Sequence, residues 1–570
     1  MPTIKLDHDL LGRMVARLGG VHDPDDVANR LPLLGCDVDR SDDSELVVEI
    51  FPDRPDLLSA STLSRALVPF LHEIETALAP EVNDGTIRLK VDADLKGIRP
   101  HVVAAVIRDV EFGQDADRFI KALMDHQEKL HFALGRRRKR ASIGVHDLDT
   151  LTPPFHAKSA SRTTEFVPLG EEAPWTVERI LDEHPKGVEY AHLLGGMERI
   201  PLIVDASGEV LSFPPILNGA RTTVSATTRD LLIDVTGWDR VAVETCLQLM
   251  CLQLEGWGGR IESVILETER GEEVTPCFTP QRHRVSSSLI RRTLGKDPDA
   301  STIRSALARM GGRLLEADEG GNLTVEMPAW RYDLLHPIDV VEDLAIGIGY
   351  DALGVQSPNT PLQGIPSPSS DLRRRLRSTF IGLGGQEITS LDLSSEEKEF
   401  TWMRWASIGA VTRLMNPITE HHTLLRQRVL PSLIDLMASN RHHDLPRIVF
   451  EVGRVVHDHR NRWRASLLVC EADGGFARIR GITQAVMSDL QVVHWSVTPT
   501  HPDRGPWLTG RGGRIEVDGT PIGCFGEVDP RVGDRFGLRV PMAGLELDVE
   551  LMLDLIPDPV RGPAGDSSGA

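Results

Sequence analysis

Four carboxylates lie close together in one short stretch of the sequence. Asp339, Glu342 and Asp343 are spaced i, i+3 and i+4, and Asp333 lies shortly upstream. On a helix this spacing places three carboxylates on one face, where like charges repel. A hard cation such as Mg²⁺ offsets that repulsion, because it prefers oxygen ligands. The alternative is a solvated acidic first turn stabilised by the helix dipole, and the spacing alone favours this alternative.

A second group of polar residues lies between apolar segments that are predicted to be strands. It comprises Ser212, Asn218, Asp234 and Thr236, with Leu202 as a candidate apolar wall. Such groups can recognise a polar ligand and place a water at an ester without a protein nucleophile. Each also has a structural interpretation, because a serine before Phe-Pro-Pro is typical of a turn and Asp-Val-Thr-Gly is typical of a strand end. For any one residue taken singly, the structural interpretation is favoured.

The third group is the one concentrated basic run of an acidic chain: Arg136, Arg137, Arg138, Lys139 and Arg140. The net charge of −21 repels phosphates over most of the surface, so any contact with nucleic acid must be local or made by a partner. The run is therefore a candidate RNA contact. It is equally compatible with a solvated helix end.

Length and composition indicate a modular cytoplasmic protein. A chain of 570 residues exceeds what one hydrophobic core supports. The longest apolar run, near residues 202–217, is interrupted by charges and prolines, so no membrane span is expected, and the N-terminus carries no export leader. The six scattered cysteines lack a Cys-x-x-Cys pair and are expected to be reduced core residues. The common phosphate-loop, zinc-protease and serine-hydrolase motifs are absent.

Hydrophobic periodicity predicts several helices and strands that position these groups. Asp239 can cap the start of one helix and Gly256 can end it. A helix–helix–strand–strand–helix order before residue 350 is typical of a winged-helix-like module. Helices are predicted over residues 6–18, 116–134, 241–254, 286–294, 300–310, from 337 onward and around 372–382, and strands over 45–51, 312–317 and 323–327.

Four parts of the chain carry long, specific motifs. The first is VEIFPDRPDLLS at residues 48–59. The second comprises RASIGVHDLD at 140–149, ILDEHPKGVEYAH at 180–192, LSFPPILN at 211–218 and DVTG at 234–237. The third is PAWRYDLLHPIDVVEDLAIGIGY at 328–350, and the fourth comprises NPIT at 416–419, LRQRVLPSL at 425–433, FEVG at 450–453 and FGEVDP at 525–530. In this order the four parts resemble the beta subunits of archaeal and eukaryotic phenylalanyl-tRNA synthetases, and the third is the strongest match.

The resemblance implies a multidomain α+β fold. The expected parts are an N-terminal α+β domain, an editing domain, a winged-helix-like domain with the acidic motif, a linker, a class II synthetase catalytic-like domain built on an antiparallel sheet with helices, and a disordered tail. Their expected bounds are residues 1–85, 86–272, 273–352, 353–370, 371–556 and 557–570. The arginine motifs with which class II synthetases bind ATP are not found intact in the last domain, which is therefore expected not to aminoacylate.

The resemblance also implies a function. A beta subunit forms a heterotetramer of two alpha and two beta subunits, supports the ATP-dependent attachment of phenylalanine to tRNA(Phe) by alpha, and hydrolyses mischarged Tyr-tRNA(Phe). It implies that Asp333, Asp339, Glu342 and Asp343 bind Mg²⁺ at a site shared with alpha. It assigns Ser212, Asn218, Asp234, Thr236 and Leu202 to the editing pocket and brings the basic run 136–140 near tRNA.

Departures from the family pattern leave alternatives open. Trp238 follows Thr236-Gly237 where the family usually has threonine, and His146 stands where it tends to have tyrosine. A bulky indole beside the pocket can alter selectivity or abolish editing, which leaves a structural, tRNA-docking subunit as one alternative. A specialised paralogue in antibiotic resistance or biosynthesis is the other.

Overall fold

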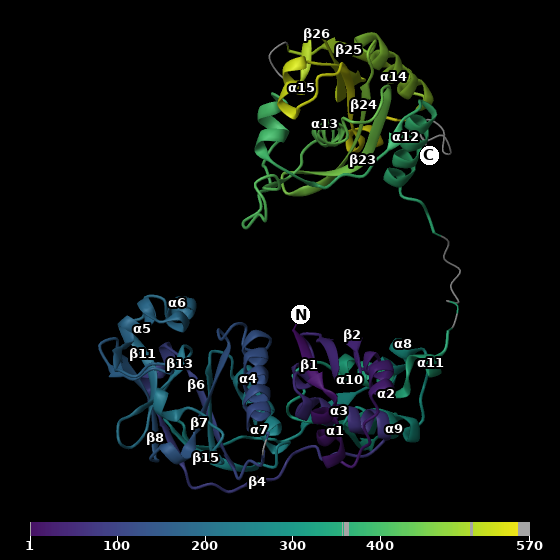
Figure 1. Cartoon of the computed structure of the whole chain (residues 1–570). Helices are drawn as coiled ribbons and strands as arrows, with labels where there is room; N and C mark the ends of the chain where they lie inside the picture. The colour runs from purple at the N-terminus through teal and green to yellow at the C-terminus, as the bar shows by residue number, and fades with distance from the viewer. Residues whose placement is uncertain (1, 114, 356, 358–363, 502–504, 557–570) are drawn as a thin grey trace. The chain divides into compact units, whose positions relative to one another are not determined.

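The computed structural model describes residues 2–113, 115–355, 357, 364–501 and 505–556. The chain divides into two compact units, Met1–Ser357 and Pro358–Ala570 (Figure 1). This division falls within the predicted linker. Most of that linker's centre and the predicted tail at 557–570 lie outside the described residues.

The first unit opens with a three-stranded antiparallel sheet in the order β1-β3-β2, covered by helices. Its elements are β1 (Thr3–Asp7), α1 (His8–Arg17), α2 (Pro24–Arg30), β2 (Cys36–Ser41), β3 (Glu45–Ile50) and α3 (Ala60–His72).

The predicted start of the first helix at residue 6 is wrong. Leu6 belongs to β1 and pairs with Leu46 of β3, and α1 begins at His8. The Asp7 side chain accepts a hydrogen bond from the Leu10 amide at 3.0 Å and so caps the helix. Ile4 and Leu6 alternate with more exposed residues along β1. The spacing of buried residues therefore changes from every second residue in the strand to the 3.6-residue period of a helix at Asp7.

A large mixed sheet follows, in the order β13-β12-β11-β8-β5-β15-β6-β14-β7, with β16 and β4 also paired to β15. Its elements, with the helices and the small β10-β9 sheet that accompany them, are β4 (Val82–Asn83), β5 (Arg88–Val91), β6 (His101–Arg108), α4 (Ala116–Phe132), β7 (Ala141–Asp147), β8 (Phe155–Ser161), β9 (Glu165–Phe166), β10 (Trp175–Thr176), α5 (Val177–Glu183), α6 (Pro185–Tyr190), β11 (Arg199–Val204), β12 (Val210–Phe213), β13 (Leu217–Asn218), η6 (Ala220–Thr222), β14 (Leu231–Gly237), α7 (Arg240–Glu255), β15 (Arg260–Thr268) and β16 (Gly271–Thr275).

Helix α7 ties this sheet to the N-terminal part. Its predicted cap is confirmed, because the Asp239 side chain accepts from the Ala242 amide at 3.1 Å, and Gly256 follows its last residue. Buried on nearly every side, α7 packs against β6, β14 and β7 and also against α3 and α4 (Figure 1). One hydrophobic core therefore runs from the N-terminal sheet into the large sheet.

The third part of the first unit has its own hydrophobic cluster. The predicted order of helices and strands is confirmed, and a strand that the periodicity missed, β17, precedes it in the sheet order β17-β19-β18. The elements are β17 (Gln281–Val285), α8 (Ser287–Leu294), α9 (Ala300–Arg309), β18 (Arg313–Ala317), β19 (Leu323–Met327), α10 (Pro337–Ile348) and α11 (Tyr350–Leu353).

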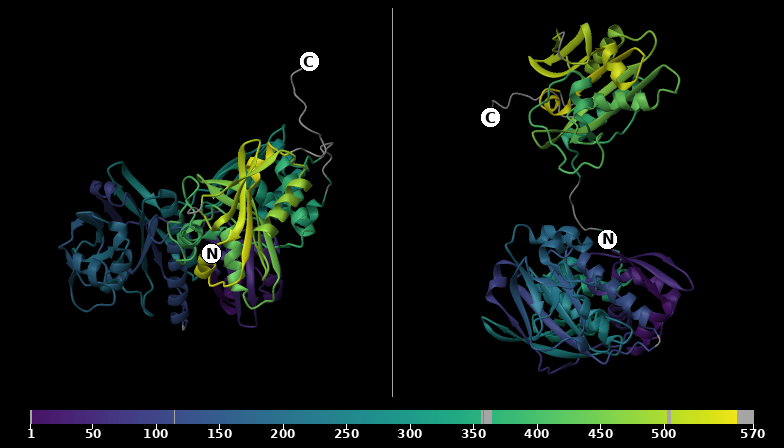
Figure 2. Two further views of the ribbon diagram at one scale, coloured as in Figure 1. Left: turned by 90° about the horizontal axis from the view of Figure 1, so that it is seen from above. Right: turned by 60° about the vertical axis from the view of Figure 1, so that its left-hand side comes forward.

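The second unit is built on a seven-stranded sheet in the order β20-β23-β24-β28-β27-β26-β25, antiparallel except for the β20–β23 pair. Figure 2 shows its long strands, coloured green to yellow, as one twisted sheet. The elements are α12 (Pro368–Gly382), β20 (Gln386–Glu387), β21 (Leu393–Ser394), the π-helix η7 (Glu397–Trp402), β22 (Leu424–Leu425), α13 (Leu430–Ser439), β23 (Arg447–His457), β24 (Arg460–Cys470), α14 (Phe476–Asp489), β25 (Trp495–Pro499), β26 (Trp507–Val517), β27 (Thr520–Val528), α15 (Pro530–Phe536), β28 (Met542–Asp548) and α16 (Val549–Leu553).

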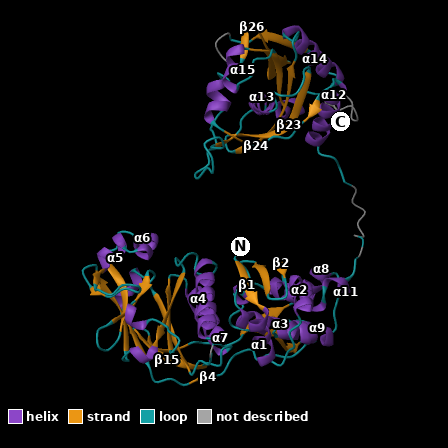
Figure 3. Cartoon of the chain, in the orientation of Figure 1, coloured by secondary structure: helices purple, strands orange, loops and turns teal. Residues whose placement is uncertain are grey.

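Two apolar cores cover the two faces of this sheet. Figure 3 shows the helices of this unit, in purple, around its orange strands. Along β24, Leu467 belongs to the core under α12, α14 and α16, whereas Leu468 belongs to the core under α13 and α15. This is the period-two alternation of a strand buried on both faces. The predicted stripe Leu372, Leu376 and Phe380 is buried on α12.

No helix among the described residues has the length and apolar character needed to cross a membrane. All six cysteines are free. Four of them are buried, as predicted, but Cys277 is exposed and Cys524 is only half-buried by accessible surface, so the expectation that all six are core residues is wrong for Cys277.

Candidate functional site

The acidic motif surrounds the start of α10. Asp339 accepts hydrogen bonds from the amides of Leu335 at 2.7 Å and His336 at 2.6 Å and so caps the helix. Asp343, one turn further on, is buried, with only 3% of its surface exposed. Its Oδ1 accepts from Arg331, but its buried Oδ2 accepts no hydrogen bond from any described residue.

Arg331 is a buried cation between two of the predicted metal ligands. It donates to Asp333 from Nε at 2.9 Å and from Nη2 at 2.7 Å, and to Asp343 from Nη2 at 2.9 Å. Burial opposes its charge, but the two carboxylates outweigh burial and raise its pKa well above the usual value. Asp333 and Asp343 are thus partly neutralised by the protein itself.

Glu342 is the exposed member of the motif. Its pKa is raised, first by partial burial and then by the charges of Asp343, Asp53, Asp339 and Asp333. Asp53 follows β3 and comes from the N-terminal segment, so the fold adds a fifth carboxylate to the four that the sequence predicted.

Arg54 is a further cation that was not predicted for this site. Buried and bidentate, it donates to Asp56 from Nε and Nη2, both at 2.9 Å, and its charge also lowers the pKa of Asp333 after that of Arg331. The only sequence signal for Asp53 and Arg54 is their place in the segment VEIFPDRPDLLS, which spacing alone does not connect with residues nearly three hundred positions later.

The donor set at α10 fits Mg²⁺. All candidate ligands are carboxylate oxygens, one of them a buried oxygen without a hydrogen bond, and Mg²⁺ usually takes only one or two protein carboxylates and keeps waters. In the described part of the chain, three carboxylate oxygens of this motif do not lie within 4.8 Å of one another. Among the described residues, the group that meets this distance is Asp37, Asp39 and Glu49.

Asp234 lies in a buried chain of polar side chains on β14 and β7. Its Oδ1 lies 2.8 Å from His146 Nε2, and His146 Nδ1 lies 2.9 Å from Thr222 Oγ1. All three side chains are buried. Gly144 leaves the necessary space, because a Cβ there would lie 2.3 Å from the Asp234 carboxylate.

Thr236 lies on the same face of β14, two residues further on. Its Oγ1 accepts from Arg99 Nε at 2.8 Å, and Arg99 Nη2 donates to Ser142 Oγ at 3.0 Å. Burial lowers the pKa of Arg99 to about 9, against the opposing charge of Asp234. Arg99 is a buried cation beside the predicted pocket that sequence reasoning missed, because no spacing signal relates it to β14.

Ser212 and Asn218 approach from the neighbouring sheet edge. They face each other across β12 and β13, and Asn218 Nδ2 donates to the Val145 carbonyl on β7 at 3.2 Å. Asn218 therefore contacts β7, the strand that pairs with β14, and Ser212 is the direct strand partner of Asn218.

Leu202 is placed differently from the prediction. It packs in a small cluster with Phe213, whereas its neighbour Ile203, which pairs with Ser212, belongs to the main core. Directly paired residues share a face and adjacent residues do not. Leu202 consequently faces the side opposite Ser212, and the predicted wall at Leu202 is wrong for a pocket on the Ser212 face.

Trp238 is 46% exposed, just after β14 ends. Its amide donates to the Arg140 carbonyl at 2.9 Å. The indole thus does not fill the buried network around Asp234 and Thr236.

The basic run forms turns between α4 and β7 rather than a helix end. Arg136, Arg137 and Arg138 all have positive φ angles of 50°, 54° and 65°, a conformation that costs energy for non-glycine residues. Arg138 is buried and donates to the Ile216 carbonyl at 2.8 Å and to Glu128 at 2.7 Å. Arg138 is therefore a structural residue, and its prediction as an RNA contact is wrong. The other four residues of the run are exposed.

Comparisons with known proteins agree on one family. Three family descriptions match consecutive segments of the chain: "B3/4 domain" at residues 100–253, "tRNA synthetase B5 domain" at 283–350 and "Phenylalanyl tRNA synthetase beta chain CLM domain" at 354–549.

Whole-length relatives point the same way. The chain is 38% identical to the phenylalanine–tRNA ligase beta subunit of Methanothrix thermoacetophila, over 97% of this chain and 100% of that protein. It is 37% identical to that of Archaeoglobus fulgidus, over 97% and 99%. An N-terminal fragment of the Pyrococcus horikoshii beta subunit is 31% identical and superposes with a TM-score of 0.57, covering 61% of this chain and all of the fragment.

Proposed function

Because the chain belongs to the family of phenylalanine–tRNA ligase beta subunits, we propose that it acts in a complex with an alpha subunit that attaches phenylalanine to tRNA(Phe) at the expense of ATP. The observation that carries this proposal is the match to beta subunits over 97% of the chain. The complex has two alpha and two beta subunits and works in the cytoplasm, and the second unit of this chain does not itself aminoacylate.

The first unit proofreads the product by hydrolysing Tyr-tRNA(Phe). A hydrophobic site rejects an added hydroxyl by only about a hundredfold, so a second, polar site is needed to remove tyrosine. The placement of Asp234 and Thr236 on β14, and of the Asn218 amide against the neighbouring strand β7, supports this role. Asp234 is fixed by His146 and Thr236 by Arg99, so these two side chains are held in place before a ligand arrives.

Within this site the residues share the work of positioning. Ser212 and Asn218 present a hydroxyl and an amide that can bind the tyrosine phenol or the attacking water. The Asp234 carboxylate accepts a hydrogen bond from a donor group of the substrate or water. Held in a buried setting, these dipoles need little reorganisation when the ester is attacked. Leu202 contributes through the packing of the small cluster behind β11.

The acidic motif at α10 would hold Mg²⁺. Glu342 and the Asp343 oxygen that accepts no hydrogen bond from a described residue would be its ligands, while Asp333 is held by Arg331 and Asp339 caps the helix. The ion would offset the repulsion among these carboxylates. Changing Glu342 to Gln is expected to lower the metal content of the complex, measured by atomic emission, without disturbing the cap at Asp339.

The exposed members of the basic run, Arg136, Arg137, Lys139 and Arg140, contact the tRNA backbone. Their exposure in an otherwise acidic chain supports this assignment.

The experiment that tests the proposal is deacylation of preformed Tyr-tRNA(Phe) and Phe-tRNA(Phe) by the purified chain, alone and with its alpha subunit. We expect selective loss of the tyrosyl ester, reduced by Ser212→Ala. If neither ester is hydrolysed while charging still depends on this chain, proofreading is refuted and a structural subunit remains. If charging is independent of the chain as well, the whole proposal fails.

A further inference from the structure

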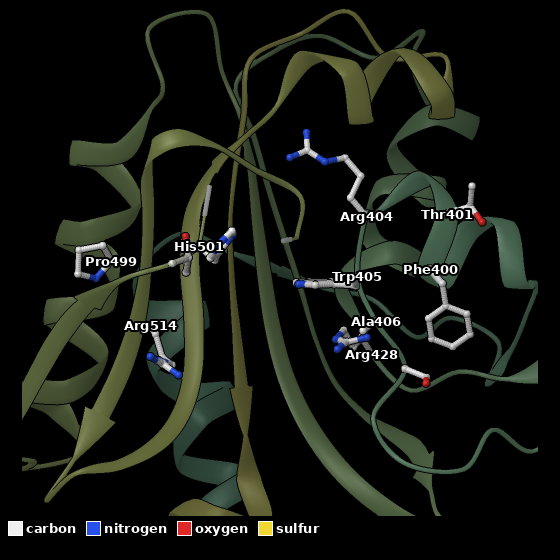
Figure 4. A pocket seen from close by; sticks show the side chains of 11 residues that line it. Phe400, Thr401, Arg404, Trp405, Ala406, Arg428, Pro499, His501 and Arg514 are labelled. Atoms are coloured by element: carbon white, nitrogen blue, oxygen red, sulfur yellow. The ribbon is translucent and has the colours of Figure 1, made fainter. Parts of the chain in front are cut away.

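A cavity of about 960 Å³ lies within the second unit, between the segment that follows η7 and the strands β25 and β26 (Figure 4). Arg404 and Arg428 line one side, and Arg514 and His501 line the other. The described residues of its wall include no carboxylate. In a chain with a net charge of −21, a wall that presents three arginines and a histidine offers cationic donors to an anion.

Arg428 is the group in this cavity that most clearly lacks a ligand. Its guanidinium lies 4.5 Å from the centre of the Trp405 ring. Its Nη1 is buried and donates to no described residue. A buried charged donor without an acceptor is costly, so an anion that accepts from Nη1 would be favoured.

The Trp405 ring that supports Arg428 is itself fixed. It packs edge-on against Trp507, with ring centres 6.1 Å apart. Gly505 passes close by, and a Cβ at that position would lie 2.8 Å from the indole nitrogen. Arg428 is thus held against a rigid aromatic surface rather than on a mobile stem.

Arg404 and Arg514 are oriented by acids that lie outside the wall. Arg404 Nη1 lies 2.8 Å from Asp529, and Arg514 Nε lies 3.2 Å from Glu516. Each contact uses part of a guanidinium that has five N–H donors. A guanidinium presents these donors in a planar fork that matches phosphate oxygens.

We propose that this cavity binds a phosphate group, carried either by a small ligand such as a nucleotide or by an RNA backbone. Its size is in the range of about 300–1,000 Å³ typical of small-molecule sites. The Trp405 and Phe400 rings add apolar surface against which a base can pack. The inference is independent of proofreading, because the site lies in the other unit.

The test is isothermal titration calorimetry of the full chain without alpha. The probes are inorganic pyrophosphate, ADP and a short single-stranded RNA. We expect saturable binding of at least one of them, weakened about tenfold by Arg514→Gln, since one charge-assisted contact is lost. Arg514 is exposed, so its loss should leave the fold intact. The matched control is Arg462→Gln, an exposed arginine of the same unit that does not line the cavity, and it should bind as the unchanged chain does.

The three probes separate the sources of the phosphate. Binding of pyrophosphate or ADP that Arg514→Gln weakens assigns the site to a small ligand. RNA binding that Arg514→Gln weakens and pyrophosphate competes away assigns it to RNA. Arg428→Gln should weaken the same probe, with circular dichroism used to verify folding. Absence of binding by all three probes, or binding that Arg514→Gln leaves unchanged, overturns the proposal. Deacylation of Tyr-tRNA(Phe) should be unaffected by Arg514→Gln, so failure here is distinguishable from failure of the proposed function.

Discussion

Asp234 Oδ1 and His146 Nε2 lie 2.8 Å apart, and both side chains are almost completely buried. The pair joins neighbouring strands, β14 and β7, and continues to Thr222. His146, which stands where the family tends to have tyrosine, is thus the buried hydrogen-bond partner of Asp234 and not a surface residue.

Replacing Asp234 with asparagine should separate chemistry from folding. The amide keeps the shape and a hydrogen bond to His146 but loses the charge, so we expect Tyr-tRNA(Phe) deacylation to fall about tenfold or more with little change in Tm. Asp234→Ala should also destabilise the first unit by about 1–3 kcal/mol, because it strands a buried imidazole nitrogen. Asp182→Asn, an exposed change on α5, is the control. Equal deacylation by Asp234→Asn and the unchanged chain would remove Asp234 from the site.

Arg331→Met should strongly destabilise the first unit. It leaves Asp333 and the buried Asp343 without their cation, a loss of about 3–5 kcal/mol in comparable buried pairs. Arg291→Met is the matched control, since Arg291 and its partner Asp297 are 66% and 54% exposed, and exposed pairs contribute about 1 kcal/mol or less. Urea unfolding compares the two variants. If both shift the midpoint equally, the burial of Arg331 does not matter for stability.

The buried Glu399 should make the second unit pH-sensitive. Burial raises its pKa from 4.5 to about 7, against hydrogen bonds from the Gln427 amide and the charge of Arg428. The folded state therefore keeps a proton on Glu399 that the unfolded state releases above pH 4.5. Protonated Glu399 thus favours the folded state at low pH, and this contribution to the free energy of unfolding is lost as the pH rises through about 7. Glu399→Gln mimics the protonated form. Calorimetry at pH 6 and pH 8 should show a smaller fall in Tm for the variant than for the unchanged chain, and an identical fall would contradict this assignment.

Trp238→Thr should leave proofreading selectivity unchanged. The indole is 46% exposed and follows the end of β14, so we expect the family's usual residue to add no contact to the buried network at Asp234 and Thr236. The measurement is the ratio of Tyr-tRNA(Phe) to Phe-tRNA(Phe) deacylation rates. A large change in that ratio would show that the tryptophan reaches the bound ester.

The exposed and buried arginines of the basic run should behave differently. Arg136→Gln and Arg137→Gln should each weaken tRNA binding. Each should also reduce the slope of log K against log salt concentration by about one, because one phosphate contact is lost. Arg138→Gln should instead lower Tm, because Arg138 holds the carbonyls of Pro215 and Ile216 and packs 4.5 Å from the Tyr190 ring centre. A filter-binding salt titration together with thermal unfolding distinguishes the two effects. Loss of binding by Arg138→Gln alone, at unchanged Tm, would reverse the assignment.

Local rules made much of the architecture predictable. Asp239 and Gly256 delimit α7, and the stripe at Leu372, Leu376 and Phe380 gives α12, because caps and a 3.6-residue period act over a few residues. The same rules failed at Leu6. The apolar period there fits a helix, yet pairing with Leu46 makes a strand, and that partner is forty residues away.

The sequence by itself determined the family, the helices and strands that local periodicity and caps specify, and the three groups of residues with chemical potential. Only the tertiary structure decided which of those residues meet. It brought Asp53 and Arg54 to the acidic motif, placed Arg331 between Asp333 and Asp343, joined Asp234 to His146, turned Leu202 away from Ser212 and buried Arg138. The physical reason is that burial, ion pairing and strand register depend on contacts between segments distant in the chain, which spacing along a single sequence does not encode.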